Sequence, residues 1–266
     1  MRTLWTTGSA TIADTVRRAL RRTADWIDIQ WSLLDESLRA VAPAARGRLL
    51  DVGCGEKPFE ASFLPHVASY VGVEHADTFA ATAAGQRARA DVVYSGGTMP
   101  FRDGAFDTVL SIQVLEHTPR PGALVAEMAR VLARDGLLIL TAPFQFRLHE
   151  EPHDYFRYSP HGLRQLCEDA GLQVVEVRQQ GSLWSVIGHK LNSYLAFRVA
   201  RAGGLMQGMG KLGHEAPQRQ PVRWWTLPAV GIGTVAVAAA ARAMDRVFFD
   251  PEESLGYLIL ARHRAT

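Results

Sequence analysis

The residues with the clearest chemical meaning are an acid and two glycines near residue 50. The segment Asp51-Val52-Gly53-Cys54-Gly55 follows two leucines, a pattern that predicts a buried parallel strand running into a tight turn. Glycines suit a turn whose backbone a ligand approaches closely, because any Cβ would obstruct the approach. Glu74 ends the next apolar strand about 20 residues later, where a carboxylate accepts hydrogen bonds from ribose hydroxyls. Together these residues predict a cofactor site.

Pro58 argues against the dinucleotide form of this loop, which has a third glycine at that position. With no pyrophosphate to hold, the loop suits a smaller ligand. It resembles the first motif of the class I S-adenosylmethionine-dependent methyltransferases, an acid followed by glycine-x-glycine. Leu115-Glu116-His117 resembles a signature of many small-molecule members of that family. The resemblance implies S-adenosyl-L-methionine as the cofactor and S-adenosyl-L-homocysteine as the product.

The resemblance also implies which residues contact the cofactor. Ser95 stands where family members often have an acid for the adenine amino group, so we expect the backbone around Thr98 and Met99 to replace it. The predicted cofactor-binding residues are Asp51, Gly53, Cys54, Gly55, Glu74, His75, Thr98, Met99, Ser111 and Gln113.

Three histidines are candidates for catalysis. A general base helps when the methyl acceptor is a hydroxyl or an enolisable carbon, and histidine suits that role near neutral pH. His117 follows the fourth predicted strand, where a structural or cofactor-contacting role is the alternative to a base. His149 and His153 lie in the loop after the fifth strand. They could instead bind a metal with Asp154, but Pro152 breaks the helix that such spacing needs, so we expect no metal site.

The segment from His149 to Ser159 resembles a His-x-x-Pro-x-Asp-aromatic-aromatic-Arg segment in one bacterial branch of the family. Its aromatic and basic residues could line an acceptor pocket. Packing is the alternative for the aromatic rings, and an ion pair with Asp154 is the alternative for Arg157. The predicted pocket residues are Tyr155, Arg157, Tyr158 and, further along the chain, Trp184.

Strands and helices alternate along most of the chain. Helical spacing of apolar residues predicts helices over 9–23, 25–41, 76–89, 121–133 and 161–170, with a short one from Pro58. Apolar runs predict strands over 49–53, 69–74, 91–94, 106–111, 137–142, 172–179 and 254–261, and Arg134-Asp135-Gly136 predicts a turn before the fifth. This alternation predicts an α/β fold, a Rossmann-like, doubly wound, mostly parallel seven-stranded sheet with ligands at the carboxyl ends of the strands.

The pattern divides the chain into four parts. They are an N-terminal helical cap (1–46), a cofactor-binding core (47–180), a helical apolar insertion (181–252) and the final strand (253–266). The cap either covers the cofactor or packs on the sheet. The insertion contains Trp184, Trp224, Trp225 and a charge-free run from Thr226 to Ala241, which is shorter than the roughly 20 residues of a spanning helix. It forms a buried helix pair, a lid, a homodimer contact or a membrane-surface contact.

The composition and one motif position argue against nucleic acid as a partner or substrate. The chain has 266 residues and a net charge of +2, too small for binding nucleic acid by general electrostatics. Base methylation is also unexpected, because Ser111-Ile112-Gln113-Val114 stands where an Asp/Asn-Pro-Pro-aromatic element would hold a flipped base. Two cysteines make no disulfide framework and no signal peptide is evident, which favours a cytoplasmic location, with membrane association left open.

The sequence therefore predicts an enzyme that transfers a methyl group to an O, N or C atom of a small, hydrophobic metabolite. A cofactor-binding regulatory or scaffolding protein without turnover is one alternative. A methyltransferase of a lipid-linked substrate at the membrane surface is another.

Overall fold

A single seven-stranded sheet forms the centre of the molecule. The computed structural model describes residues 25–77, 89–202 and 226–264. The strand order is β3-β2-β1-β4-β5-β7-β6; β7 pairs antiparallel with β5 and β6, and the other pairs are parallel. This confirms the predicted mostly parallel sheet. The strands are β1 (Arg48–Val52), β2 (Ser69–His75), β3 (Val92–Tyr94), β4 (Phe106–Ile112), β5 (Leu132–Pro143), β6 (Leu172–Gln180) and β7 (Gly256–His263).

The strand order reverses between β1 and β4. From β1 the chain adds β2 and β3 on one side, and β4 then pairs with β1 on the other side. In sheets of this kind a ligand binds outside the carboxyl ends of the strands at such a reversal. The loops that follow β1 and β4 therefore bound the expected binding site.

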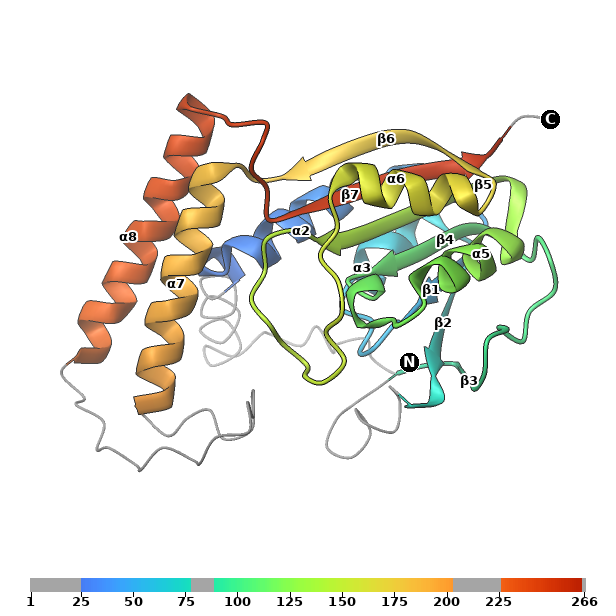
Figure 1. The fold of residues 1–266 in the computed structure, drawn as a ribbon, viewed down its shortest axis with the longest axis horizontal. Coiled ribbons are helices and arrows are strands. Elements are labelled where there is room, and N and C mark those ends of the chain that lie inside the picture. Colours follow the sequence, from blue (N-terminus) through green and yellow to red (C-terminus); the bar gives the residue numbers. More distant parts are fainter. Residues whose placement is uncertain (1–24, 78–88, 203–225, 265–266) are drawn as a thin grey trace, which may run out of the picture.

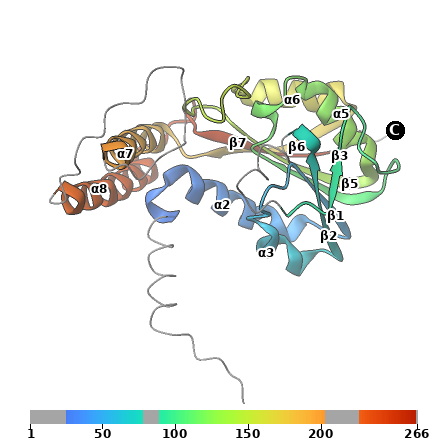
Figure 2. The same ribbon diagram turned by 90° about the horizontal axis from the view of Figure 1, so that it is seen from below.

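Helices cover both faces of the sheet (Figure 2). One face carries α2 (Ile29–Val41) and the short α3 (Glu60–Phe63), and the opposite face carries α5 (Pro121–Val131) and α6 (Pro160–Asp169). In α2, Leu34, Leu38 and Val41 are buried against sheet residues such as Leu49. The alternation of strands with helices thus produces two cores, one on each face.

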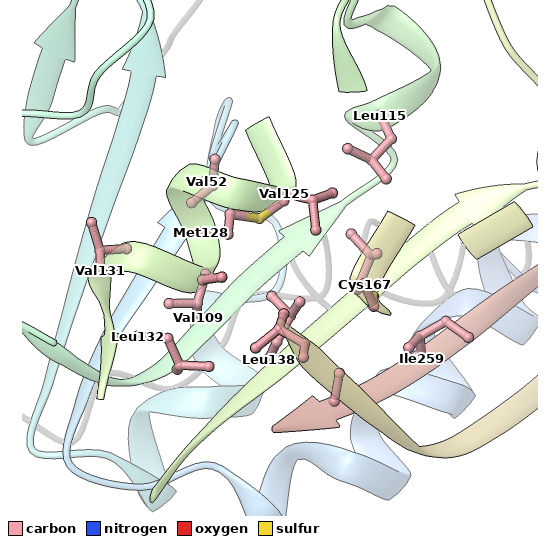
Figure 3. Packing of buried hydrophobic residues seen from close by; sticks show 14 of the residues in the cluster. Val52, Val109, Leu115, Val125, Met128, Val131, Leu132, Leu138, Cys167 and Ile259 are labelled. Atoms are coloured by element: carbon pink, nitrogen blue, oxygen red, sulfur yellow. The ribbon is translucent and has the colours of Figure 1, made fainter. Parts of the chain in front are cut away.

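The larger core lies under α5 and α6. Figure 3 shows Val125 and Met128 of α5 pointing toward Val109 of β4, with Cys167 of α6 and Leu138 of β5 beside them. Each of these side chains is fully buried. Burying a side chain of this size contributes on the order of 1.5–3 kcal/mol, so this packing fixes the strand ends that hold the site.

The N-terminal prediction is met only in part. The helix predicted over 9–23 lies outside the described residues, as does most of the one predicted over 76–89. In the helix predicted over 25–41, residues 25–27 are helical and the helix is interrupted at Asp28. Asp28 accepts a hydrogen bond from the N–H of Trp31 and so caps α2, which begins at Ile29. Within the described residues this segment packs on the sheet.

Two local predictions near the sheet need correction. The helix predicted from Pro58 begins at Glu60 and ends after one turn, where Pro65 enters a 3-10 turn over Leu64–His66. The turn predicted at Arg134-Asp135-Gly136 lies inside β5, since Leu132 already pairs with Phe106 of β4. The next pair joins Leu137 to Thr108, so residues 133–136 bulge out of the ladder.

The insertion forms a helix pair, α7 (Leu183–Ala202) and α8 (Thr226–Val247), before the last strand. Both views show the two helices side by side beyond the end of the sheet (Figures 1 and 2). Asp245 near the end of α8 accepts hydrogen bonds from the N–H groups of Ser182 (3.2 Å) and Trp184 (3.1 Å) and from the hydroxyls of Ser182 and Ser185. A carboxylate at a helix N-terminus satisfies donors that the helix leaves unpaired, so Asp245 caps α7 from outside it.

The helix pair is joined to the core through α2. Ile29 of α2 packs with Val186 of α7 and Ala238 of α8, and Asn192 donates to the carbonyls of Ile27 (3.3 Å) and Thr234 (3.1 Å). The pair thus has a fixed position beside the carboxyl edge. Among the described residues, neither α7 nor α8 nor any other helix has the length and apolar character needed to cross a bilayer.

Candidate functional site

The glycine loop after β1 is held against β2. The N–H groups of Gly53 (2.9 Å) and Cys54 (3.3 Å) both donate to the carbonyl of Val73. Gly53 has φ +73°, and a Cβ there would lie 2.5 Å from a methyl of Val114 in the loop after β4. Gly55 has φ +48°, and among the residues that the structure describes no atom lies within 4 Å of the position of a Cβ. The loop therefore leaves a backbone cradle at the strand reversal, where only glycine adopts the conformation without strain.

Glu74 lies beside this cradle. Its carboxylate accepts a hydrogen bond from the N–H of Gly55 at 3.0 Å, and the residue is 6% exposed. Burial raises the pKa of Glu74 above its usual value, and the backbone N–H groups of Gly55 and His75 oppose that rise. An ionised carboxylate has about four lone-pair positions, so Glu74 keeps acceptor capacity for ligand hydroxyls. The next residue, His75, packs its ring edge-on against Tyr94 at 5.2 Å.

Asp51 lies deeper than Glu74. It is 4% exposed and accepts a hydrogen bond of 2.6 Å from the hydroxyl of Tyr70. Burial raises the pKa of Asp51 to about 7, and the nearby charge of Glu74 adds to the rise while the Tyr70 hydroxyl opposes it. Burial also raises the pKa of the Cys54 thiol to about 12, so Cys54 is a neutral wall of the loop and no nucleophile at neutral pH.

The loop after β3 is anchored by α5. Met99 is buried, its N–H donates to Glu127 at 2.8 Å, and its carbonyl accepts from Arg130 at 3.0 Å. The peptide groups of Met99 that we expected to contact adenine thus already have partners. Thr98 is exposed beside them.

Two predicted cofactor residues lie at the carboxyl end of β4. Ser111 is fully buried, and its hydroxyl has no hydrogen-bond partner among the residues that the structure describes. Gln113 has φ +54° and donates from its main-chain N–H to the carbonyl of Thr141 (3.1 Å) and from its side chain to the Thr141 hydroxyl (3.2 Å). The loop after β4 is therefore fixed to the end of β5.

His117 and His149 come together with Glu116. The rings of the two histidines lie edge to face with centroids 4.6 Å apart. The Nε2 atom of His117 lies 3.9 Å from Oε1 of Glu116. Glu116 is fully buried, and neither carboxylate oxygen has a hydrogen-bond partner in the described part of the chain. Burial raises the pKa of Glu116 to about 8.

The third predicted catalytic histidine, His153, lies outside this group. Its ring is exposed and its Nδ1 lies 3.1 Å from the hydroxyl of Tyr155. Its main-chain carbonyl, however, lies 2.9 Å from Nδ1 of His117. The segment 149–158 thus contributes one ring and one carbonyl to the surroundings of His117.

An ion pair shapes that segment. Arg157 binds both carboxylate oxygens of Asp154, at 2.6 and 2.7 Å, and donates to the carbonyls of Phe146 (3.1 Å) and Arg147 (2.8 Å). Burial opposes ionisation of Asp154, but hydrogen bonds from Arg157 and from the N–H of His149 outweigh it and hold its pKa at about 2. Of the two roles that the sequence left open for Arg157, the structure therefore shows the ion pair with Asp154.

A pocket of about 310 Å³ opens between the loop after β5 and α7. It is lined by Gln145, Arg147, His189, Lys190, Ser193 and Tyr194. The ring of Phe146 lies between the two regions, 4.8 Å from that of His149 and 5.3 Å from that of His189. The pocket is therefore one aromatic ring away from the histidine group.

None of the four predicted pocket residues lines this pocket. Tyr158 is buried and donates to the carbonyl of Leu115 at 3.1 Å, and Tyr155 is exposed. The main-chain N–H of Trp184 donates to Asp245 at the start of α7. Sequence reasoning missed Glu116, although it stands beside His117 in the Leu-Glu-His signature. It also missed His189 and Lys190, for which the amphipathic pattern of α7 was the available signal.

Comparisons with known proteins agree with this geometry. Residues 50–140 match the family model described as "Methyltransferase domain". An "Uncharacterized methyltransferase" of Mycobacterium avium (strain 104) is 42% identical over 116 residues, which cover 41% of this chain and 46% of that protein. One from Mycobacterium leprae (strain TN) is 42% identical over 104 residues, which cover 38% of each chain. The matches thus span less than half the length of these relatives.

One solved structure shares the fold over most of the chain. It is a Haloferax volcanii complex between the Trm112 methyltransferase activator and a methyltransferase, with a TM-score of 0.50, 16% identity, and coverage of 94% of this chain and 97% of that one. At this identity the likeness concerns the fold alone.

Proposed function

We propose that the chain is a class I S-adenosylmethionine-dependent methyltransferase, since residues 50–140 match the methyltransferase-domain model. It would bind S-adenosyl-L-methionine at the reversal between β1 and β4 and transfer the methyl group to an O, N or C atom of a small metabolite. The cradle at Gly55, open in front and flanked by the buried Glu74 carboxylate, is the observation that carries this proposal.

The residues present fit the cofactor. Gly53 and Gly55 keep the loop free of side chains where the cofactor approaches the backbone. Glu74 would accept hydrogen bonds from the ribose hydroxyls. The hydroxyl of Ser111, which has no partner within the described part of the chain, is a further polar group at the same edge. The bound cofactor supplies a methyl group on a positively charged sulfur. The chain's part is to align the acceptor with that methyl group and exclude water.

The acceptor would enter from the side of α7. The pocket volume of about 310 Å³ is at the lower end of the range for small-molecule sites. Tyr194 offers an apolar surface, while Lys190 offers positive charge. We therefore expect a largely apolar acceptor that carries an acidic or strongly polar group.

Calorimetric titration with S-adenosylmethionine and S-adenosylhomocysteine tests the cofactor part. We expect saturable binding of both by the wild-type protein and loss of binding in an Asp51→Ala, Glu74→Ala double variant. Incubation with methyl-labelled cofactor and an acceptor panel separates an enzyme from a binding protein without turnover. No binding of either ligand by the wild-type protein contradicts the proposal.

One observation favours a variant of this function, in which the acceptor is lipid-linked and the protein lies on a membrane surface. Apolar side chains on α8 and just after it are more than half exposed, namely Ile232, Val247, Phe248 and Phe249. Such a surface suits contact with lipid. Co-sedimentation with phospholipid vesicles, lost in a Phe248→Ser, Phe249→Ser variant, would support it, and no sedimentation of the wild-type protein would contradict it.

A further inference from the structure

Glu116, His117 and His149 place three potential metal-ligand atoms in one small volume. One such atom from each side chain lies within 4.8 Å of the other two. Glu116 and His117 belong to a 3-10 turn after β4 (Leu115–His117), and His149 comes from the loop after β5. Ligands about 2.1 Å from a tetrahedral ion lie roughly 3.4 Å apart, so the ligand atoms need to approach one another by up to about 1.4 Å.

The second nitrogen of each histidine already faces a hydrogen-bond acceptor. Nδ1 of His117 lies 2.9 Å from the carbonyl oxygen of His153. Nδ1 of His149 lies 3.2 Å from a carboxylate oxygen of Asp154 and 3.3 Å from the carbonyl oxygen of Arg147. Because these oxygens only accept, the proton of each neutral imidazole belongs on Nδ1, which leaves the lone pair on Nε2. Histidines that bind metals show this arrangement, in which the outer nitrogen donates to a carbonyl or carboxylate.

Glu116 supplies an independent reason for an ion. Its carboxylate is fully buried, and within the described residues both of its oxygens lack a hydrogen-bond donor. Leaving a buried polar group unpaired costs free energy, and for a carboxylate the cost is larger still. Oε1 lies 3.9 Å from Nε2 of His117, so the unpaired group points toward the histidines.

The surrounding charge and access also suit a cation. A second carboxylate oxygen, from the exposed Glu150, lies 3.9 Å from Nε2 of His117. Arg157 is the positive charge beside the group, and it is bound by Asp154. The side chains of His117 and His149 are 19% and 21% exposed, so an ion can enter from solvent and keep an open coordination position.

We propose that Glu116, His117 and His149 bind a divalent transition-metal ion, and that an oxygen atom of the methyl acceptor takes an open position on that ion. Two imidazoles and one carboxylate are a donor set typical of Zn²⁺ and of other first-row divalent ions. The second part of the proposal rests on the proposed methyl transfer, and the first part does not. Asp154 acts here as a positioning residue, since it orients His149.

Zinc titration of tag-free, chelator-treated protein tests the site. We expect one Zn²⁺ per chain in the wild-type protein. His149→Ala and Glu116→Gln should lose more affinity than the roughly 10–100-fold that loss of an outer-shell partner costs, and Asp154→Asn should fall within that range. His153→Ala is the matched control, because its ring lies outside the group while its carbonyl remains. It should bind Zn²⁺ as the wild type does.

Two further readouts complete the test. S-adenosylhomocysteine binding by His149→Ala shows that the variant is folded, and it reports on the proposed function separately from the metal. With Co²⁺ in place of Zn²⁺, addition of acetohydroxamate should change the visible absorption if a coordination position is open. Wild-type affinity for Zn²⁺ in His149→Ala, or no single-site binding by the wild-type protein, overturns the proposed site. An unchanged Co²⁺ spectrum overturns the open position.

Discussion

The main-chain N–H of Gly55 donates a hydrogen bond of 3.0 Å to the carboxylate of Glu74. This contact joins the loop after β1 to the end of β2, the two elements that bound one side of the proposed cofactor site. The conformation of the loop therefore depends on the same carboxylate that we expect to bind the ribose.

Substitution of Glu74 should separate these two roles. Glu74→Gln keeps an acceptor for the Gly55 N–H but loses the charge, and Glu74→Ala loses both. Hydrogen bonds to charged groups contribute about 1.5–3 kcal/mol, which corresponds to roughly 10–100-fold in affinity. We expect calorimetry to show weaker S-adenosylhomocysteine binding in the order wild type, Gln, Ala. Glu176→Gln on the far strand β6 serves as the control, and equal affinities for all four proteins would contradict the assignment.

Asp51 should make stability fall with rising pH. Its pKa is raised to about 7 in the folded protein, against 3.8 for an unperturbed Asp, so the folded state holds a proton that the unfolded state has released. Stability therefore falls between about pH 4 and pH 7, by up to about 1.4 kcal/mol per pH unit, and is constant above that range. Asp51→Asn removes this loss while keeping an acceptor for the hydroxyl of Tyr70.

Urea unfolding at pH 5 and pH 8 checks this prediction. The unfolding free energy of Asp51→Asn minus that of the wild type should be larger at pH 8 than at pH 5. Taking the difference removes contributions from acids that the substitution leaves unchanged. A difference that is the same at both pH values would show that Asp51 does not titrate in this range.

Asp154 should make stability rise with pH, the opposite of the effect of Asp51. Its folded-state pKa of about 2 is below the unperturbed value of 3.8, so its ion pair with Arg157 stabilises the fold above about pH 4. That stability is lost as the pH falls toward 2. Asp154→Asn should lower the unfolding free energy by about 2 kcal/mol at pH 7 and by less at pH 3. Thermal unfolding at the two pH values measures this, and an equal loss at both would contradict the account.

Local patterns predicted the elements around the candidate cofactor site. The glycine turn after β1 and the position of Glu74 at the end of β2 follow from spacing within about 30 residues. The predicted cap of α6 by Ser159 also agrees, with the N–H of Gly162 donating to its hydroxyl. Contacts between distant segments escaped prediction. Glu116 is buried because the loop after β5 covers it, with the N–H groups of Tyr155 and Phe156 donating to its carbonyl.

The errors have the same origin. Arg134-Asp135-Gly136 has the composition of a turn, but pairing of Leu132 with Phe106 extends β5 through it. Trp184 has the appearance of a pocket residue, yet the cap that Asp245 provides from 61 residues away fixes the start of its helix. Local sequence does not encode which distant strand or side chain a segment will meet.

The most direct test of the account compares alanine substitutions at two glycines that both have positive φ. Gly55 (φ +48°) and Gly171 (φ +78°) both adopt the left-handed conformation, and a Cβ at either would meet no atom of the described residues within 4 Å. Gly171 lies after α6, whereas Gly55 forms the proposed cradle. Titration with S-adenosylhomocysteine should show unchanged affinity in Gly171→Ala and a loss of at least about tenfold, or about 1.4 kcal/mol, in Gly55→Ala. Equal affinity in both variants, or no binding by the wild-type protein, would contradict the proposed cofactor site.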